Sequence, residues 1–220
     1  MDEYHETLGE VASYILSSDD TIRQSREFQA GGKLYKGFQI SRSNNIISIV
    51  SPQESGYLSV ELSSTLAART QGTVDEDGLE QIHKQHQSNV NQNINETEAL
   101  DLHLRQELPD LDDENTRAAM EEIEQIIDDV NVRLDWVSYS DTNLLNGFII
   151  YTRLFPDSLS IESYDDSVNQ IRHYAPQIED EFINAFGSFL EEIEGDSEEV
   201  PTGGGDSEEV RRGTGGRGFA

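Results

Sequence analysis

Residues 143–186 read NLLNGFIIYTRLFPDSLSIESYDDSVNQIRHYAPQIEDEFINAF, and this stretch decides the fold. Within it, residues 147–155 place apolar and aromatic side chains on both alternating faces, which predicts a strand in the interior of a sheet. Pro156 and Asp157 then turn the chain, because both residue types favour turns. The stretch therefore predicts a central strand that is followed closely by a helix.

The predicted helix is long and amphipathic. Ser160 can cap its first turn through the side-chain oxygen, and apolar residues recur at spacings of three and four from Ile161 to Phe189. Pro176 lies inside this pattern and has no N–H group to donate to the preceding turn. We therefore expect either a kink or a break into two helices at Pro176.

Three strands are predicted upstream, at LYKGFQIS (34–41), IISIV (46–50) and YLSVEL (57–62). Apolar and polar residues alternate in the first and the third of them, as in strands with one buried face. Residues 43–45 (SNN) suit a tight hairpin between the first two. The three strands are therefore expected to form an antiparallel meander. Residues 22–29 (IRQSREFQ) fit either a first strand or a second helical turn.

Two more helices and one more strand follow from the spacing of apolar residues. The helix at the start of the chain has one apolar face, made of Tyr4, Leu8, Val11 and Ile15. A second helix begins at about Asp112, and its apolar face is made of Met120, Ile123, Ile127, Val130 and Leu134. A strand at 135–140 (DWVSYS) is then expected to be joined to the strand at 147–155 across residues 141–143.

The predicted element order is α-β-β-β-α-β-β-α. Strands that are grouped apart from helices favour an α+β fold, here a two-layer sandwich with an antiparallel sheet. Residues 1–190 are expected to form one such domain, with a poorly ordered acidic insertion at about 64–112 in which helices around 76–90 and 96–107 are the alternative. Residues 191–220 repeat GDSEEV and lack large apolar residues, which predicts a disordered acidic and Gly-rich tail.

The net charge of the chain excludes some classes of binding partner. The chain has 44 Asp and Glu against 15 Lys and Arg, a net charge of −29. A field this negative repels nucleic acid and anionic lipid, so we expect neither nucleic acid nor a membrane as a partner. No apolar run is long enough to span a bilayer, and the acidic N-terminus lacks the pattern of a secretory signal, which favours a cytoplasmic protein.

The acidic residues are spread through the whole chain, which suggests a halophilic archaeon as the source. At about 1 M salt the Debye length falls to about 3 Å, so the self-repulsion of an acidic chain largely vanishes. The alternative is an acidic protein from a mesophile that binds a basic partner. In the first case the acidity reports the solvent and not the partner.

Few residues suggest a catalytic or metal-binding site. The absence of Cys excludes disulfides, thiolate zinc sites and Cys nucleophiles. His83 and His86 lie three residues apart, with His103 nearby in the sequence, and together with a carboxylate they could hold a divalent metal. Solvated helix residues are the simpler interpretation of these histidines. We therefore assign no catalytic, cofactor-binding or metal-binding residue, and we expect no cofactor and no enzymatic activity.

The stretch quoted first also carries a family resemblance. A strand of the form GFIIYTRLF, then Pro-Asp and a helix that opens on Leu-Ser, resembles the last strand–helix unit of the type III secretion chaperone-like superfamily, including its YbjN-like members. The resemblance covers about residues 3–62 and 113–190, and the long acidic stretch between them departs from the family pattern. It implies a non-catalytic protein that dimerises and binds partner segments along sheet or helix surfaces.

The sequence thus favours a chaperone-like adaptor or regulator that binds a protein partner and forms a homodimer. Aromatic residues contribute most to such surfaces. The candidate interaction surface consists of Trp136, Tyr139, Tyr151, Phe155, Phe182 and Phe186. Two alternatives stay open: a small metal-assisted hydrolase or nucleotide-binding protein that uses the His83/His86 region, and an acidic DNA mimic that captures a basic protein through its charge.

Overall fold

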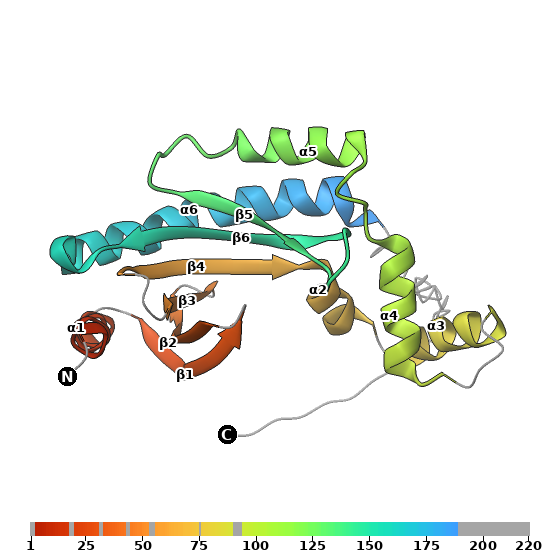
Figure 1. Ribbon diagram of the computed structural model, residues 1–220, viewed down its shortest axis with the longest axis horizontal. Helices are drawn as coiled ribbons and strands as arrows, with labels where there is room; N and C mark the ends of the chain where they lie inside the picture. Colours follow the sequence, from red (N-terminus) through yellow and green to blue (C-terminus); the bar gives the residue numbers. More distant parts are fainter. Residues whose placement is uncertain are drawn as a thin grey trace, which may run out of the picture.

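Six antiparallel strands form one sheet in the computed structural model, in the order β1-β2-β3-β4-β6-β5 (Figure 1). The structure describes residues 3–17, 20–30, 33–42, 45–52, 56–74, 76–89 and 94–188. The strands are β1 (Thr21–Ala30), β2 (Lys33–Arg42), β3 (Asn45–Pro52), β4 (Leu58–Thr65), β5 (Arg133–Ser138) and β6 (Leu145–Leu154). As the sequence predicts, β6 lies inside the sheet, between β4 and β5.

Helices form the second layer of this α+β sandwich, as the sequence also predicts. They are α1 (Glu3–Ser17), α2 (Leu66–Thr73), α3 (Glu76–Asn89), α4 (Glu96–Glu107), α5 (Glu114–Glu124) and α6 (Ile161–Phe186), with a short 3₁₀ turn, η1 (Pro156–Ser158), before α6. The long helix α6 packs on β4 and β6, and both α1 and α5 contact it. Figure 1 shows α1 at one end of the molecule and the pair α3–α4 at the other.

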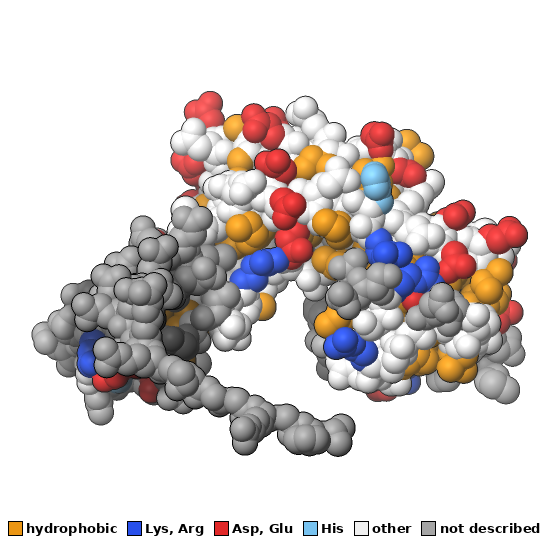
Figure 2. Space-filling model, turned by 180° about the vertical axis from the view of Figure 1, so that it is seen from behind, with side chains coloured by type: hydrophobic (Ala, Val, Ile, Leu, Met, Phe, Trp, Pro, Cys, Tyr) orange, Lys and Arg blue, Asp and Glu red, His pale blue; other side chains and the backbone are white. Residues whose placement is uncertain are grey.

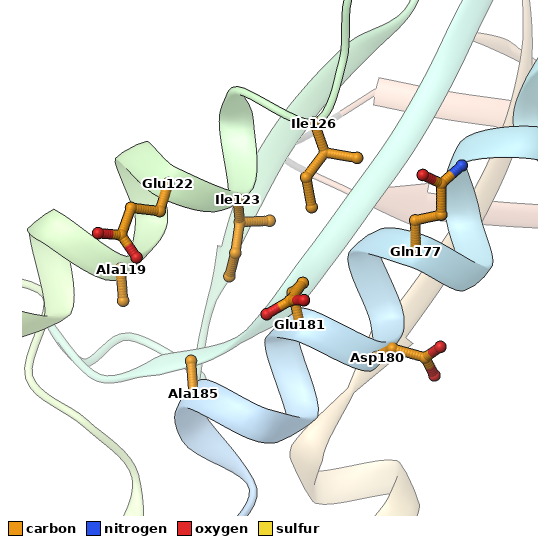
Figure 3. Close-up of a pocket in the computed structure, with 8 residues that line it drawn as sticks. All are labelled: Ala119, Glu122, Ile123, Ile126, Gln177, Asp180, Glu181 and Ala185. Carbon is orange, nitrogen blue, oxygen red and sulfur yellow. The ribbon is translucent and has the colours of Figure 1, made fainter.

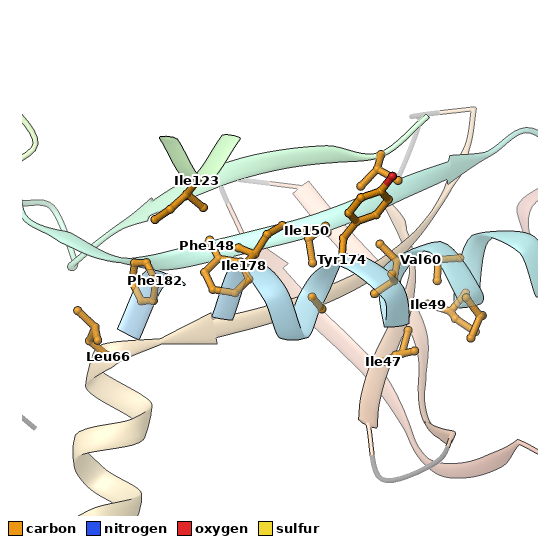
Figure 4. Packing of buried hydrophobic residues seen from close by; sticks show 14 of the residues in the cluster. Ile47, Ile49, Val60, Leu66, Ile123, Phe148, Ile150, Tyr174, Ile178 and Phe182 are labelled. Atoms are coloured by element: carbon orange, nitrogen blue, oxygen red, sulfur yellow. The ribbon is translucent and has the colours of Figure 1, made fainter. Parts of the chain in front are cut away.

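The hydrophobic core lies between α6 and one face of the sheet (Figure 4). Phe148 of β6 meets Phe182 of α6 with ring centroids 5.3 Å apart, and both side chains are fully buried. The cross-strand pairs Ile49–Val60 and Val60–Thr152 continue this face from β3 through β4 to β6. Alternate residues of each strand thus face the helices, and the residues between them face the other side.

Helix α6 begins as predicted and continues through Pro176, where a kink or a break was expected. Ser160 and Ser163 form a reciprocal capping box at its first turn. Pro176 does not break the helix, which is continuous from Ile161 to Phe186. Tyr174, Ala175 and Ile178 on both sides of the proline are buried. Their packing on the sheet holds the two halves together and offsets the missing backbone hydrogen bond.

The predicted helix to Leu134 is too long. Helix α5 ends at Glu124, Val130 is 79% exposed, and Leu134 belongs to β5. Five residues after this end, the Asp129 carboxylate accepts a hydrogen bond from the backbone N–H of Asn131 (2.8 Å) and another from Gln170 on α6 (2.7 Å), which hold the chain in a non-helical path. Local side-chain bonds of this kind compete with helical ones and were not visible in the apolar spacing.

Two other segments differ from the expected order. The ambiguous residues 22–29 lie in β1, which adds a sixth strand next to β2. Within the segment expected to be a poorly ordered insertion, the structure has helices α2, α3 and α4, with Ala99 and Leu104 buried in the core. Helix α4 also has a full capping box, between Asn95 and Glu98. The predicted tail at 191–220 lies outside the described residues.

A buried ion cluster ties the first third of the chain to α6. Arg42 at the end of β2 forms a two-pronged salt bridge with Asp20 and contacts Asp165 at 2.8 Å. The hydroxyl of Tyr164 donates to Asp20 at 2.8 Å, and the Asp20 side chain is fully buried. The hydrogen bond with Asp20 raises the pKa of Arg42, and burial together with Asp20 raises the pKa of Tyr164. The charges of the cluster thus satisfy one another away from water.

Across the part of the chain that the structure describes, none of the helices combines the length and the apolar character that crossing a lipid bilayer would require.

Candidate interaction surface on the open sheet face

The structure does not bring the six predicted surface residues together. Phe182 and Phe186 lie in the core, at 0% and 8% exposure. Trp136 packs on Phe182 with ring centroids 6.2 Å apart, and its indole N–H donates to Glu124 at 2.7 Å. These three rings belong to the covered side of the sheet, where α5 and α6 pack over it. Helical spacing alone does not distinguish such core aromatics from a binding face.

Tyr139 has a structural role at the end of β5. Its hydroxyl donates to Asp101 on α4 at 2.7 Å, and the guanidinium of Arg105 lies 5.6 Å from the centre of its ring. Burial and the neighbouring carboxylate raise the pKa of Tyr139 to about 12. The contact therefore joins α4 to the sheet and leaves the hydroxyl with a partner inside the protein.

The two remaining residues, Tyr151 and Phe155, meet on the other face of the sheet together with Tyr57 and Arg153. The guanidinium of Arg153 lies 4.8 Å from the centre of the Tyr57 ring and 5.4 Å from that of Tyr151. Arg153 also donates to the Tyr151 hydroxyl at 3.3 Å. The rings of Tyr57 and Phe155 are 6.2 Å apart. We call these four residues the aromatic–arginine cluster.

The register of β4 and β6 produces this cluster. Ser59 lies opposite Arg153 and Glu61 opposite Tyr151, so all four share one face. Because side chains alternate along a strand, this is the face opposite to Phe148 and the core. We call it the open face. Phe155 follows directly after β6 on the same alternation and is 52% exposed, one of the few large apolar side chains that the structure leaves exposed.

Glu61 lies at the centre of the open face and is partly buried. Burial raises the pKa of its carboxyl group, and a hydrogen bond with Ser59 acts weakly in the opposite direction. Arg133 of the edge strand β5 lies opposite Tyr151 on the other side. Of the described carboxylates, none forms a salt bridge with Arg133 or Arg153. These cations are therefore available to a group from outside.

Charge is unevenly distributed along the sheet. Residues 21–52, which contain β1, β2 and β3, have five basic residues and one acid, a net charge of +4 within a chain of −29. Their open-face positions adjoin those of β4, since β3 pairs with β4 through Ser48 and Glu61. The least acidic half of the sheet, β1 to β3, therefore lies next to the strands that carry the cluster, although Arg42 and Lys36 within it are already paired with Asp20 and Glu27. The composition of residues 21–52 could have indicated this from the sequence alone.

The histidines expected for a metal site are partly separated. His83 lies with its Nε2 2.7 Å from the backbone oxygen of Ile94. His86, only 1% exposed, instead faces His103 on α4 with ring centroids 5.9 Å apart. Within the described residues, no group of three or more His, Asp or Glu side chains is placed to hold a metal ion. The histidine pair thus packs α3 on α4.

Comparisons with known proteins give little information. No protein-family model matches the chain, and no curated protein does. A solved structure of an uncharacterized protein from Methanothermobacter thermautotrophicus is similar at a TM-score of 0.46, with 11% sequence identity over 82% of this chain and 99% of that chain. A similarity of this size supports no argument about fold or function.

Two of the four residues of the aromatic–arginine cluster were predicted from the sequence. Tyr151 and Phe155 were predicted as aromatic residues of a strand and its end, but Tyr57 and Arg153 were not. The signal for Arg153 is its position two residues from Tyr151 and from Phe155, on the same side of a strand. Tyr57 comes directly before another strand, β4, so only the β4–β6 pairing could place it there.

Proposed function

We propose that the protein is a non-enzymatic protein-interaction module, a chaperone-like adaptor or regulator, and that its partner binds the open face at the aromatic–arginine cluster. The observation that carries the proposal is Arg153, which lies against two tyrosine rings and beside the exposed ring of Phe155. The homodimer, the family resemblance and the halophilic source remain predictions from the sequence.

The composition of the cluster suits a binding hot spot. Tyrosine and arginine are enriched among the residues that dominate binding energy, and such residues cluster in a pocket or patch that becomes desolvated. Stacking on Tyr57 and Tyr151 holds the Arg153 side chain in place before a partner arrives. Less side-chain freedom is then lost on binding, which favours affinity.

The charges of the open face favour a particular partner chemistry. Arg153 and Arg133 can each form a two-pronged pair with a carboxylate. Phe155 and Tyr57 offer apolar surface beside these cations. Residues 21–52, next to β4, have a net positive charge and therefore repel an acidic partner less than the strongly acidic remainder of residues 1–190 does. We therefore expect a protein segment that carries carboxylates next to an apolar or aromatic side chain.

Site-specific photo-cross-linking in the source cells would test the proposal. A photoreactive residue is placed at position 155, and the matched control carries it at position 121, an exposed position of α5 on the helix side of the sheet. We expect a discrete adduct of a second protein from position 155 only. Arg153→Ala in the position-155 protein should remove that adduct.

Binding of the protein identified in that adduct would then be measured in vitro. Arg153→Ala or Phe155→Ala should weaken the complex by about tenfold or more, the size of effect seen at hot spots. Ile161→Ala, at an exposed apolar position on α6, is the control and should leave affinity unchanged. Equal adducts from positions 155 and 121, or an affinity that neither cluster variant changes, would refute the proposal.

A further inference from the structure

A groove of about 510 Å³ lies between α5 and α6, on the helix side of the sheet and away from the open face. Its lining residues are Ala119, Glu122, Ile123, Ile126, Gln177, Asp180, Glu181 and Ala185. In Figure 3, Ile123 of α5 and Ile126, two residues after α5 ends, point into the space between the helices, and Glu181 of α6 lies in the same space. The groove thus combines an apolar floor with carboxylates.

The groove carboxylates have no cation near them. Among the described side chains, neither Glu122, Asp180 nor Glu181 forms a salt bridge with a Lys or Arg. Figure 2 shows the same charge pattern on a larger scale, with acidic side chains spread over the upper part of the molecule, where α5 and α6 lie, and the visible Lys and Arg side chains lower down. A ligand of this groove must therefore supply positive charge and apolar surface.

One segment of the chain outside the described residues has this composition. Residues 211–220 read RRGTGGRGFA, with three arginines, one phenylalanine and no acid. The 20 residues before them, 191–210, contain nine acids and no base. Charge complementarity therefore selects the last ten residues, and not the whole C-terminal part, as a match for the groove.

The length of chain outside the structure permits this contact. Helix α6 ends at Gly187, and 23 residues, 188–210, separate Gly187 from Arg211. Extended chain spans about 3.3–3.6 Å per residue, so this connection can reach about 75 Å. The groove follows α6 from Gln177 to Ala185, about 12 Å of helix directly before Gly187. A tethered segment also meets such a site at an effective concentration in the millimolar range, so weak contacts suffice.

We propose that residues 211–220 dock in the α5–α6 groove of the same chain, with arginines paired to Glu122 and Glu181 and with Phe219 on the apolar floor. The groove is then closed by the chain itself. A partner that carries a basic segment could bind there only by displacing these residues. Because the groove and the open face lie on opposite sides of the sheet, this docking is independent of the proposed partner site.

Paramagnetic relaxation in the full-length protein would test the docking. The sequence has no Cys, so Ala220→Cys gives a single position for a nitroxide spin label. In ¹⁵N-labelled protein we expect the label to broaden the backbone amide signals of Ala119, Glu122 and Ala185. The amides of α1 around Val11, at the other end of the molecule, should keep their intensity (Figure 1).

Variants give the matched controls. Replacing Arg211, Arg212 and Arg217 by Ala should abolish the broadening at the groove, and so should the double reversal Glu122→Lys and Glu181→Lys. The reversal Glu162→Lys with Asp166→Lys, at exposed positions near the other end of α6, should leave the broadening intact. Unchanged amide positions in the sheet verify that each variant is folded.

Three results would overturn the proposal. The first is broadening that is absent from the groove or spread evenly over the protein. The second is broadening that survives the triple arginine variant. The third comes from mixing two samples, one with the spin label but no ¹⁵N and the other with ¹⁵N but no spin label. Broadening that appears only in this mixture would mean that the tail binds a second copy of the protein. None of these results bears on the cross-linking at position 155.

Discussion

Two arginines on opposite faces of the same sheet have opposite surroundings. Arg42, on the covered side, is 11% exposed and is paired with the fully buried carboxylate of Asp20. Arg153, on the open face, is exposed and lies against the rings of Tyr57 and Tyr151. In a chain with 44 acids, one arginine is neutralised inside the protein, and the other forms no salt bridge with a described carboxylate. The face of the sheet on which each arginine lies, and not the residue type, decides this difference.

The aromatic residues of the two faces also differ in burial, and this difference predicts the largest change in stability. Phe182→Ala removes a fully buried ring that contacts Phe148, and should lower the free energy of unfolding by about 3–5 kcal/mol. Phe155→Ala removes a half-exposed ring and should change it by less than about 1 kcal/mol. Urea denaturation of both variants measures the difference. Equal losses would mean that Phe155 is part of the core.

The next largest expected change in stability distinguishes Arg42 from Arg153. Asp20→Ala leaves Arg42 nearly buried with only Asp165, and should cost about 3 kcal/mol, the lower end of the range for breaking a buried ion pair. Arg153→Ala should cost less than about 1 kcal/mol of folding stability, as for exposed side chains.

The control for these two variants is Arg117→Ala. It removes an exposed salt bridge with Asp112 and should lower the free energy of unfolding by at most about 1 kcal/mol. Denaturant midpoints of the three variants would be compared at one salt concentration. A cost for Arg153→Ala that matches the cost for Asp20→Ala would remove the distinction between the two faces.

The smallest expected change in stability comes from Glu61, a partly buried carboxylate on the open face. Burial raises the pKa of its carboxyl group in the folded protein, so ionisation opposes folding. The stabilising effect of the protonated form is complete below the pKa of the unfolded chain and is lost as the pH rises through the folded pKa. At pH 7 Glu61→Gln should therefore raise the free energy of unfolding, by less than about 1 kcal/mol.

The pH dependence separates this cause from others. The gain from Glu61→Gln should shrink as the pH falls through the raised pKa of the folded protein, and should have vanished below 4.5, the ordinary pKa of the group, because the wild-type carboxyl is then protonated as well. Glu122→Gln, at an exposed position of α5, is the control and should show no comparable gain. A destabilising Glu61→Gln would show that a cation near Glu61 stabilises its ionised form.

Much of the fold was predictable because it depends on local periodicity. The apolar residues on both faces of 147–155 indicated a central strand, and β6 is central. The cap at Ser160 was predictable because the cap and its target lie within one turn. The non-helical path after α5 was not predictable, since one of the hydrogen bonds that hold Asp129 comes from Gln170, about 40 residues away in the sequence.

The candidate site was less predictable than the fold. Six aromatic residues were candidates for the surface, yet three face the core and one is held by Asp101. Alternation along a strand shows that Tyr151, Arg153 and Phe155 share a side, but not which side the helices cover. The covering of one face by α6 made Phe148 core and left Phe155 exposed.

The sequence by itself determined the central strand β6, the capped start of α6 and the strongly negative net charge. Periodicity and capping depend on residues close together in the chain, and net charge depends on composition alone. Only the tertiary structure decided which arginine is buried with a carboxylate, which rings meet, and where a groove opens between α5 and α6. These outcomes depend on strand pairing and helix packing between residues far apart in the chain, and no local pattern encodes those contacts.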